Sequence, residues 1–156
     1  MDVVDLDPVL IDAVARRKAV LFLGAGASLG ATRTNGQKIP DAQTLGALLS
    51  EEFLNSEYDR ADFKTIYDFS CSTRSVREVQ DFIYKTLIDY TPAPFHFLIP
   101  RFAWAGIVTT NYDLIIETTY ENAAAPLQVL LPNRKDGDGV AETLGHNGLL
   151  YVKLHG

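Results

Sequence analysis

Residues that could do chemistry follow three apolar runs of this 156-residue chain, at positions 19–23, 106–109 and 149–154. The first run ends in Gly24-Ala25-Gly26-Ala27-Ser28. A turn of such small residues leaves backbone N–H groups uncovered, so a phosphate can approach them closely. The stretch predicts a seat for a nucleotide phosphate, or alternatively a tight strand-to-loop turn whose small residues serve packing.

The spacing of these glycines departs from two phosphate-binding motifs. The dinucleotide fingerprint is Gly-x-Gly-x-x-Gly, but Leu29 stands at its third glycine and Gly30 comes one residue later. The P-loop has a lysine before its Ser or Thr, and Ala27 stands there instead. The glycine turn alone therefore leaves both interpretations open.

The second apolar run continues into Thr110-Asn111-Tyr112-Asp113. Asn111 offers a donor and an acceptor, so it could orient a water molecule or a ribose hydroxyl. Asp113 could accept a hydrogen bond from a ligand amide. Both residues could instead cap the helix that is predicted to follow. Tyr112 could pack on a ligand ring or simply be buried.

The third run ends in His155, the best candidate for a general base because the unperturbed pKa of imidazole lies near neutral pH. A structural histidine is the alternative. His96, between two phenylalanines, is predicted to be packed and hydrogen-bonded, and His146 to be solvated. The single cysteine, Cys71, is interpreted as a passive thiol. The sequence therefore indicates neither an internal disulfide nor a metal site.

Strand and helix patterns alternate along the chain. Strands are predicted at 19–23, 106–109, 127–131 and 149–154, the first of them buried on both faces, and a helix is predicted through Ile115, Ile116 and Tyr120. This alternation predicts an α/β fold, with a Rossmann-like parallel sheet and helices on both faces. Ligands of such sheets bind beyond the carboxyl ends of the strands. The glycine turn, the segment of Asn111 and Asp113, and His155 are therefore expected to meet at one edge of the sheet.

A helical insertion is predicted over about residues 41–100, between the first two strands. Before it, residues 29–40 are predicted to be an irregular polar loop, placed to act as a lid. Inside the insertion, the caps and apolar spacing predict helices from Pro40-Asp41 to Phe53, from Asp59 to Ser70, from Ser75 to Leu87 with a capping box, and a short one through His96 and Leu98.

Composition excludes several classes of function. The net charge of −6 means that the chain as a whole does not attract nucleic acid. The one basic cluster, Arg16-Arg17-Lys18, is interpreted as the last turn of a helix that starts at Asp7-Pro8. No apolar run reaches the length of a membrane span, and the acidic start is no secretion signal. One domain, residues 1–156, and a cytoplasmic location are expected.

Taken together and in this order, the motifs resemble those of the sirtuin (silent information regulator two) superfamily. Gly24 to Ser28 resembles its Gly-Ala-Gly-(Ala/Val)-Ser nucleotide turn, Thr109 to Asp113 resembles its Thr-Gln-Asn-x-Asp motif, and Lys153 to Gly156 resembles its His-Gly motif. Weaker matches lie at Ile39-Pro40-Asp41 and at 92–96. The resemblance spans nearly the whole chain, as a sirtuin-like NAD-binding domain.

The resemblance implies NAD as ligand and substrate, without a metal. Backbone amides of Gly24, Ala25, Gly26, Ala27 and Ser28 would hold its diphosphate, and the loop of Pro40 would cover it. Asn111 and Asp113, beside Thr110, would lie at the nicotinamide ribose and carboxamide. His155 would be the base on a ribose hydroxyl or a water. The reaction would cleave the nicotinamide–ribose bond through an oxocarbenium-like state.

Two departures favour one branch of that superfamily. Thr110 replaces glutamine and Tyr112 replaces isoleucine, as in the bacterial sirtuin-like proteins of defence against phage, whose members hydrolyse NAD. The first hypothesis is therefore an NAD⁺ hydrolase that works as a homo-oligomer or with a fused or companion sensor protein. The alternatives are an NAD-dependent protein deacylase and a non-catalytic nucleotide-binding or interaction module. Because the chain stops at the His-Gly motif, the sheet is expected to be incomplete at its C-terminus, as part of a larger domain or protein.

Overall fold

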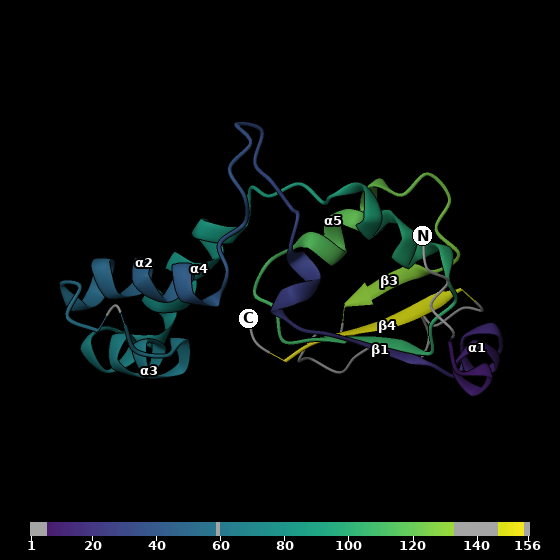
Figure 1. The fold of residues 1–156 in the computed structure, drawn as a ribbon, viewed down its shortest axis with the longest axis horizontal. Helices are drawn as coiled ribbons and strands as arrows, with labels where there is room; N and C mark the ends of the chain where they lie inside the picture. Colours follow the sequence, from purple (N-terminus) through teal and green to yellow (C-terminus); the bar gives the residue numbers. More distant parts are fainter. Residues whose placement is uncertain (1–5, 59, 133–146, 155–156) are drawn as a thin grey trace.

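The structure is a computed structural model that describes residues 6–58, 60–132 and 147–154. Its centre is a sheet of four parallel strands in the order β1-β2-β4-β3, flanked by helices (Figure 1). The strands are β1 (Val20–Leu23), β2 (Gly106–Thr109), β3 (Val129–Pro132) and β4 (Gly148–Lys153). The predicted α/β, Rossmann-like class is confirmed, and each strand lies within two residues of its predicted bounds.

Strand β2 occupies a central position that decides which chain segments meet. Leu23 at the end of β1 pairs with Thr109 of β2, and Thr109 pairs with Lys153 of β4. Because all three strands run in the same direction, the segments that follow them leave the sheet side by side. The polar segments after β1 and β2 therefore lie at one edge of the sheet, as predicted. The third predicted segment ends in His155, which lies outside the described residues.

The two faces of the sheet are covered differently. On one face, Leu23, Ile107 and Leu149 form a buried core with helix α5 (Ile115–Asn122), and the 3₁₀ helix η2 (Pro94–Arg101) contributes Ile99. On the other face, Val20 and Phe22 are 59% and 62% exposed. The prediction that the first strand is buried on both faces is therefore wrong, because its side chains alternate between a covered and an exposed face. The predicted helices on both faces are likewise not found among the described residues, where α5 and η2 pack on the covered face.

Helix α1 (Pro8–Ala15) begins as predicted, since the Asp7 carboxylate accepts from the Val9 N–H at 2.8 Å. Its end differs from the prediction. Arg16 is the C-cap and Arg17 has a φ of 56°, in the left-handed region, so the basic cluster follows the helix and does not form its last turn. No helix in the described parts of the chain is both long and apolar enough to cross a bilayer.

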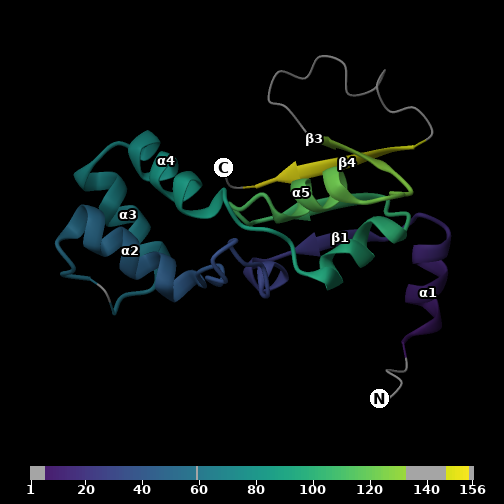
Figure 2. The same cartoon turned by 90° about the horizontal axis from the view of Figure 1, so that it is seen from above.

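Three helices form a separate body beyond the carboxyl ends of the strands, here called the helical lobe (Figures 1 and 2). They are α2 (Ala42–Leu54), α3 (Phe63–Thr73) and α4 (Val76–Leu87). Each starts at a residue whose side chain accepts from the first turn, namely Asp41, Asp62 and Ser75, and the Ser75–Glu78 capping box is confirmed. Their inward residues, including Leu49, Ile66 and Ile83, form a second apolar core.

Residues 29–40 are more ordered in conformation than the predicted irregular loop. The Arg33 N–H donates to the Gln37 carbonyl at 2.8 Å and the Ile39 N–H to the Ala31 carbonyl at 3.0 Å, which makes a short hairpin. Gly36, with φ of 82°, supplies the left-handed conformation that the tip requires. Thr32 also exchanges two backbone hydrogen bonds with Thr91, on the segment that returns from the helical lobe. This pairing fixes the hairpin where the chain crosses between the sheet and the lobe.

A substitution at Leu49 tests which face of α2 points into the core of the helical lobe. Its side chain is fully buried, so Leu49→Ala should lower the free energy of unfolding by about 2–5 kcal/mol in chemical denaturation. Leu48→Ala, at the neighbouring half-buried position, is the control and should cost clearly less. Equal losses at the two positions would contradict the assignment of this face.

Candidate functional site

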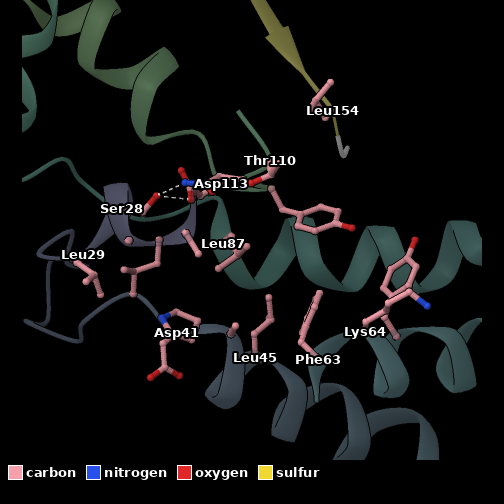
Figure 3. Close-up of a pocket in the computed structure, with 18 of the residues that line it drawn as sticks. Ser28, Leu29, Asp41, Leu45, Phe63, Lys64, Leu87, Thr110, Asp113 and Leu154 are labelled. Carbon is pink, nitrogen blue, oxygen red and sulfur yellow. Dashed lines mark hydrogen bonds between the residues drawn. The ribbon is translucent and has the colours of Figure 1, made fainter. Parts of the chain in front are cut away.

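A cavity of about 980 Å³ lies between the carboxyl edge of the sheet and the helical lobe (Figure 3). Ligand pockets of proteins typically measure about 300–1,000 Å³, so this one has room for a large ligand. Its sheet side holds sequence-predicted residues, and its opposite side holds apolar and aromatic residues of α2, α3 and α4. The predicted residues that line it are Ala25, Gly26, Ser28, Pro40, Thr110, Asn111 and Asp113.

The glycine turn forms a single 3₁₀ turn, η1 (Ala25–Ser28), directly after β1. A Cβ atom added to Gly24 or Gly26 would meet no other protein atom within 4 Å, and neither residue has a positive φ. Protein packing and backbone conformation therefore do not explain these two glycines. The space beside them is open, which favours the phosphate-seat interpretation over the packing alternative.

Asn111, Ser28 and Asp113 form one buried hydrogen-bond chain at the sheet side of the cavity. The Asn111 Nδ2 donates to the Gly24 carbonyl at 3.0 Å and to the Ser28 Oγ at 2.9 Å. The Ser28 Oγ in turn donates to the Asp113 Oδ2 at 2.6 Å (Figure 3). The three residues are 8%, 5% and 7% exposed, in the order Asn111, Ser28, Asp113. This chain joins the segment after β1 to the segment after β2.

The side-chain oxygen of Asn111 is left without a partner. Its Oδ1 is buried and accepts no hydrogen bond from any described residue. A buried carbonyl oxygen without a donor costs free energy, and native proteins seldom leave one unpaired. Asn111 lines the cavity, and a ligand hydroxyl or a water is the kind of donor that its Oδ1 lacks. Because this oxygen is itself buried, the side-chain amide must move slightly before such a donor can reach it.

The capping alternatives for Asn111 and Asp113 have different outcomes. The N-cap of α5 is Leu114, but the Asp113 Oδ1, one residue earlier, accepts from the Ile115 N–H at 3.0 Å. Asp113 therefore satisfies the first amide of α5 and also bonds to Ser28. Asn111 does not cap α5. Its own N–H donates to the Thr109 Oγ1 at 3.0 Å, and its amide reaches across to the glycine turn.

His96 is packed and hydrogen-bonded, as predicted. Its ring is fully buried; Nδ1 accepts from the Ala93 N–H at 2.8 Å, which leaves Nε2 to donate to the Ala27 carbonyl at 2.7 Å. The imidazole therefore ties η2 to the glycine turn. The other two histidines, His146 and His155, lie outside the described residues.

Lys153 has a positioning role that the sequence analysis missed. Its ammonium donates to the Asp113 carbonyl at 2.6 Å and to the Glu117 Oε1 at 2.8 Å, so β4 is tied both to the segment after β2 and to α5. The Lys153 side chain is 20% exposed and that of Glu117 is 21% exposed. The sequence signal that could have indicated this role is a charged residue at the end of an otherwise apolar strand.

Two tyrosines stand on the aromatic side of the cavity. Burial, and after it the hydrogen-bonded Cys71 side chain, raises the pKa of Tyr67 to about 12. Burial likewise raises the pKa of Tyr112, whose ring centroid lies 6.5 Å from that of Phe63. Both phenols therefore keep their protons at neutral pH and can donate hydrogen bonds. Cys71 beside them is half-buried, in keeping with a passive thiol.

Within the described ranges, no group of three His, Cys, Asp or Glu side chains is arranged to hold a metal ion. No protein-family model matches the chain, and no curated protein matches it either. The function is therefore inferred from the cavity and from the motif residues around it.

The Lys153–Glu117 pair can be tested through stability. Lys153→Met leaves the mostly buried Glu117 carboxylate without its cation, and should lower the free energy of unfolding by about 2 kcal/mol, less than for a fully buried pair because both groups reach some solvent. The double variant Lys153→Met/Glu117→Leu should recover most of that loss in urea unfolding. A double variant as unstable as the single one would contradict the pairing.

Proposed function

We propose that this chain is an NAD⁺ glycohydrolase domain of sirtuin-like type, with the cavity between sheet and helical lobe as its NAD site. Three features support the proposal. Several of the motif residues that resemble the sirtuin set line one cavity, although Gly24 and Ala27 do not; the space at Gly24 and Gly26 is open; and Asn111 has a buried acceptor without a partner. The last of these carries the most weight, because protein packing does not account for it.

Each group of residues around the cavity would have its own role in binding or hydrolysis. The N–H groups at the start of η1, those of Ala25 and Gly26, would face the diphosphate, which carries the negative charge that uncovered amides favour. The predicted role of the Ala27 amide is not available, because its N–H already donates to the Gly24 carbonyl at 2.9 Å. The Asn111 Oδ1 would accept from a ribose hydroxyl or from the attacking water. Asp113 and Lys153 would hold Asn111's segment in place through the contacts described above. The aromatic wall of Phe63 and Tyr112 would keep bulk water from the reacting carbon.

The proposed reaction is a hydrolysis. A water oxygen forms a bond to C1′ of the nicotinamide ribose while the C1′–N bond breaks and its electron pair leaves with nicotinamide. The water proton passes to a base, and the products are nicotinamide, ADP-ribose and a proton. By resemblance that base is His155, which lies outside the described residues. Action in defence against phage, as an oligomer or with a sensor protein, belongs to the same proposal.

Asn111→Ala tests the role of the unpaired acceptor. With the full chain and NAD, and without any acylated peptide, the variant should release nicotinamide at least about 100-fold more slowly, since positioning of the reacting groups is lost. His155→Ala should show a similar loss. The control is Asn122→Ala, an exposed residue of α5, which should keep wild-type turnover. Thermal unfolding of each variant separates loss of chemistry from loss of fold.

Two outcomes would overturn the hydrolase proposal. If the wild-type chain binds NAD but releases no nicotinamide, the site binds the dinucleotide without cleaving it. If release begins only when an acylated lysine peptide is added, the chain is a deacylase, because water is then not the acceptor.

Gly26→Val tests the phosphate seat through binding alone. Since a Cβ at Gly26 meets no protein atom, the variant should unfold within about 4 °C of the wild type, while its Kd for NAD should rise at least about tenfold because the side chain occupies the ligand's space. Calorimetric titration and a thermal melt measure the two quantities. Unchanged affinity would show that the glycine turn is not the seat.

A further inference from the structure

A second hollow, of about 560 Å³, lies against helices α2 and α4 and is lined by other residues of these helices than the first cavity. It is formed by the hairpin of residues 29–40, the first half of α2 and the second half of α4. The two hollows share Pro40 and no other residue that lines them. On α2, Leu45 faces the first cavity while Thr44 and Leu48 face the second. The second hollow is therefore a separate site.

The charge of this second hollow is opposite to that of the chain. Three cations line it, Arg33, Lys38 and Lys85, and its described lining contains no Asp or Glu, although the whole chain has a net charge of −6. The three ion pairs found in the described ranges involve other residues, so none of these cations is neutralised by a carboxylate there. A concave surface with uncompensated positive charge attracts anions.

Arg33 is held in a fixed position at this hollow. Its Nη2 donates to the Thr86 carbonyl at 2.8 Å, and the guanidinium carbon lies 4.7 Å from the centre of the buried Tyr90 ring. The contact with Thr86 joins the hairpin to α4. A guanidinium fixed in this way loses little conformational entropy when it meets an anion.

The remaining wall is apolar and aromatic. Leu48 and Phe82 are half-buried there, beside Pro40 and the ring of Tyr90. A site that binds a bare inorganic anion does not need an apolar wall, whereas a site that binds a ligand with a ring does. The combination of three cations with apolar walls defines the chemistry of the occupant.

We propose that this hollow binds a small aromatic anion, a phosphorylated or comparably charged ring compound, at a site distinct from the NAD cavity. The cations Arg33, Lys38 and Lys85 take the charged group, and Leu48 and Phe82 take the ring, while the buried Tyr90 ring supports Arg33. The site lies on the hairpin that pairs with Thr91 where the chain crosses between sheet and helical lobe, so its occupant contacts both the crossing segment and the lobe.

The test uses 1-naphthyl phosphate, titrated into the full chain by calorimetry. The wild type should bind it with a Kd of about 1 mM or lower, and inorganic phosphate should bind at least about tenfold more weakly because it lacks the ring. The double variant Lys38→Ala/Lys85→Ala should raise the Kd for 1-naphthyl phosphate at least about tenfold. Both lysines are exposed, so the variant should keep the wild-type thermal melt.

Lys64→Ala is the matched control, since Lys64 is an exposed lysine that lines the first cavity. Its Kd should stay within about twofold of the wild type. The proposal is overturned if the wild type does not bind 1-naphthyl phosphate at about 10 mM, if the double variant binds it as well as the wild type, or if the Lys64 variant is the one that loses binding. The measurement needs no NAD turnover, so its outcome is independent of the hydrolase proposal.

Discussion

The side-chain amide of Asn111 is the interaction on which the candidate site depends. Through the Gly24 carbonyl and the Ser28 hydroxyl it links residues 87 and 83 positions away in sequence. Ser28 extends the link to Asp113, which also accepts from the first N–H of α5. Buried hydrogen bonds of this kind are costly to break because each leaves an unsatisfied group. The glycine turn, the end of β2 and the start of α5 are thus held in one arrangement.

Two further contacts support the same arrangement from outside. His96 holds the Ala27 carbonyl from the side of η2, and Lys153 holds the Asp113 carbonyl from the side of β4. Both use a side chain to satisfy a backbone oxygen of the site segments. The consequence is a site wall whose backbone is fixed by groups that do not themselves reach into the cavity, since neither His96 nor Lys153 lines it. Such preorganisation favours ligand binding, because the backbone of the site loses little conformational entropy when a ligand binds.

Much of the fold could be predicted from the sequence because its signals are local. Apolar runs that end in glycine or polar residues gave the strands, and Asp41 and Ser75 marked helix starts through their capping geometry. The strand order in the sheet was outside such reasoning, since it depends on contacts between distant segments. The exposed side chains of Val20 and Phe22 were also missed, because an apolar run looks the same whether one face or both are covered.

The candidate site was predictable in part. The residues that follow β1 and β2 could be assigned to one sheet edge by topology alone. The partners of each side chain could not: nothing in the spacing distinguishes Asp113 as the acceptor for the first amide of α5 from Asp113 as the acceptor for Ser28, and it is both. Lys153 was missed because its partners, Asp113 and Glu117, are 40 and 36 positions away.

Within the residues that the structure describes, the chain crosses between sheet and helical lobe twice, and the Thr32–Thr91 pair joins the two crossings to each other. Two separate linkers would let the lobe twist and slide independently of the sheet. Two linkers bonded side by side behave as a single pivot. The apolar core of the lobe also includes Ile115 of α5, with Tyr112 packed against it. The backbone pair and this packing together hold the lobe at one angle to the sheet, and that angle sets the width of the cavity between them.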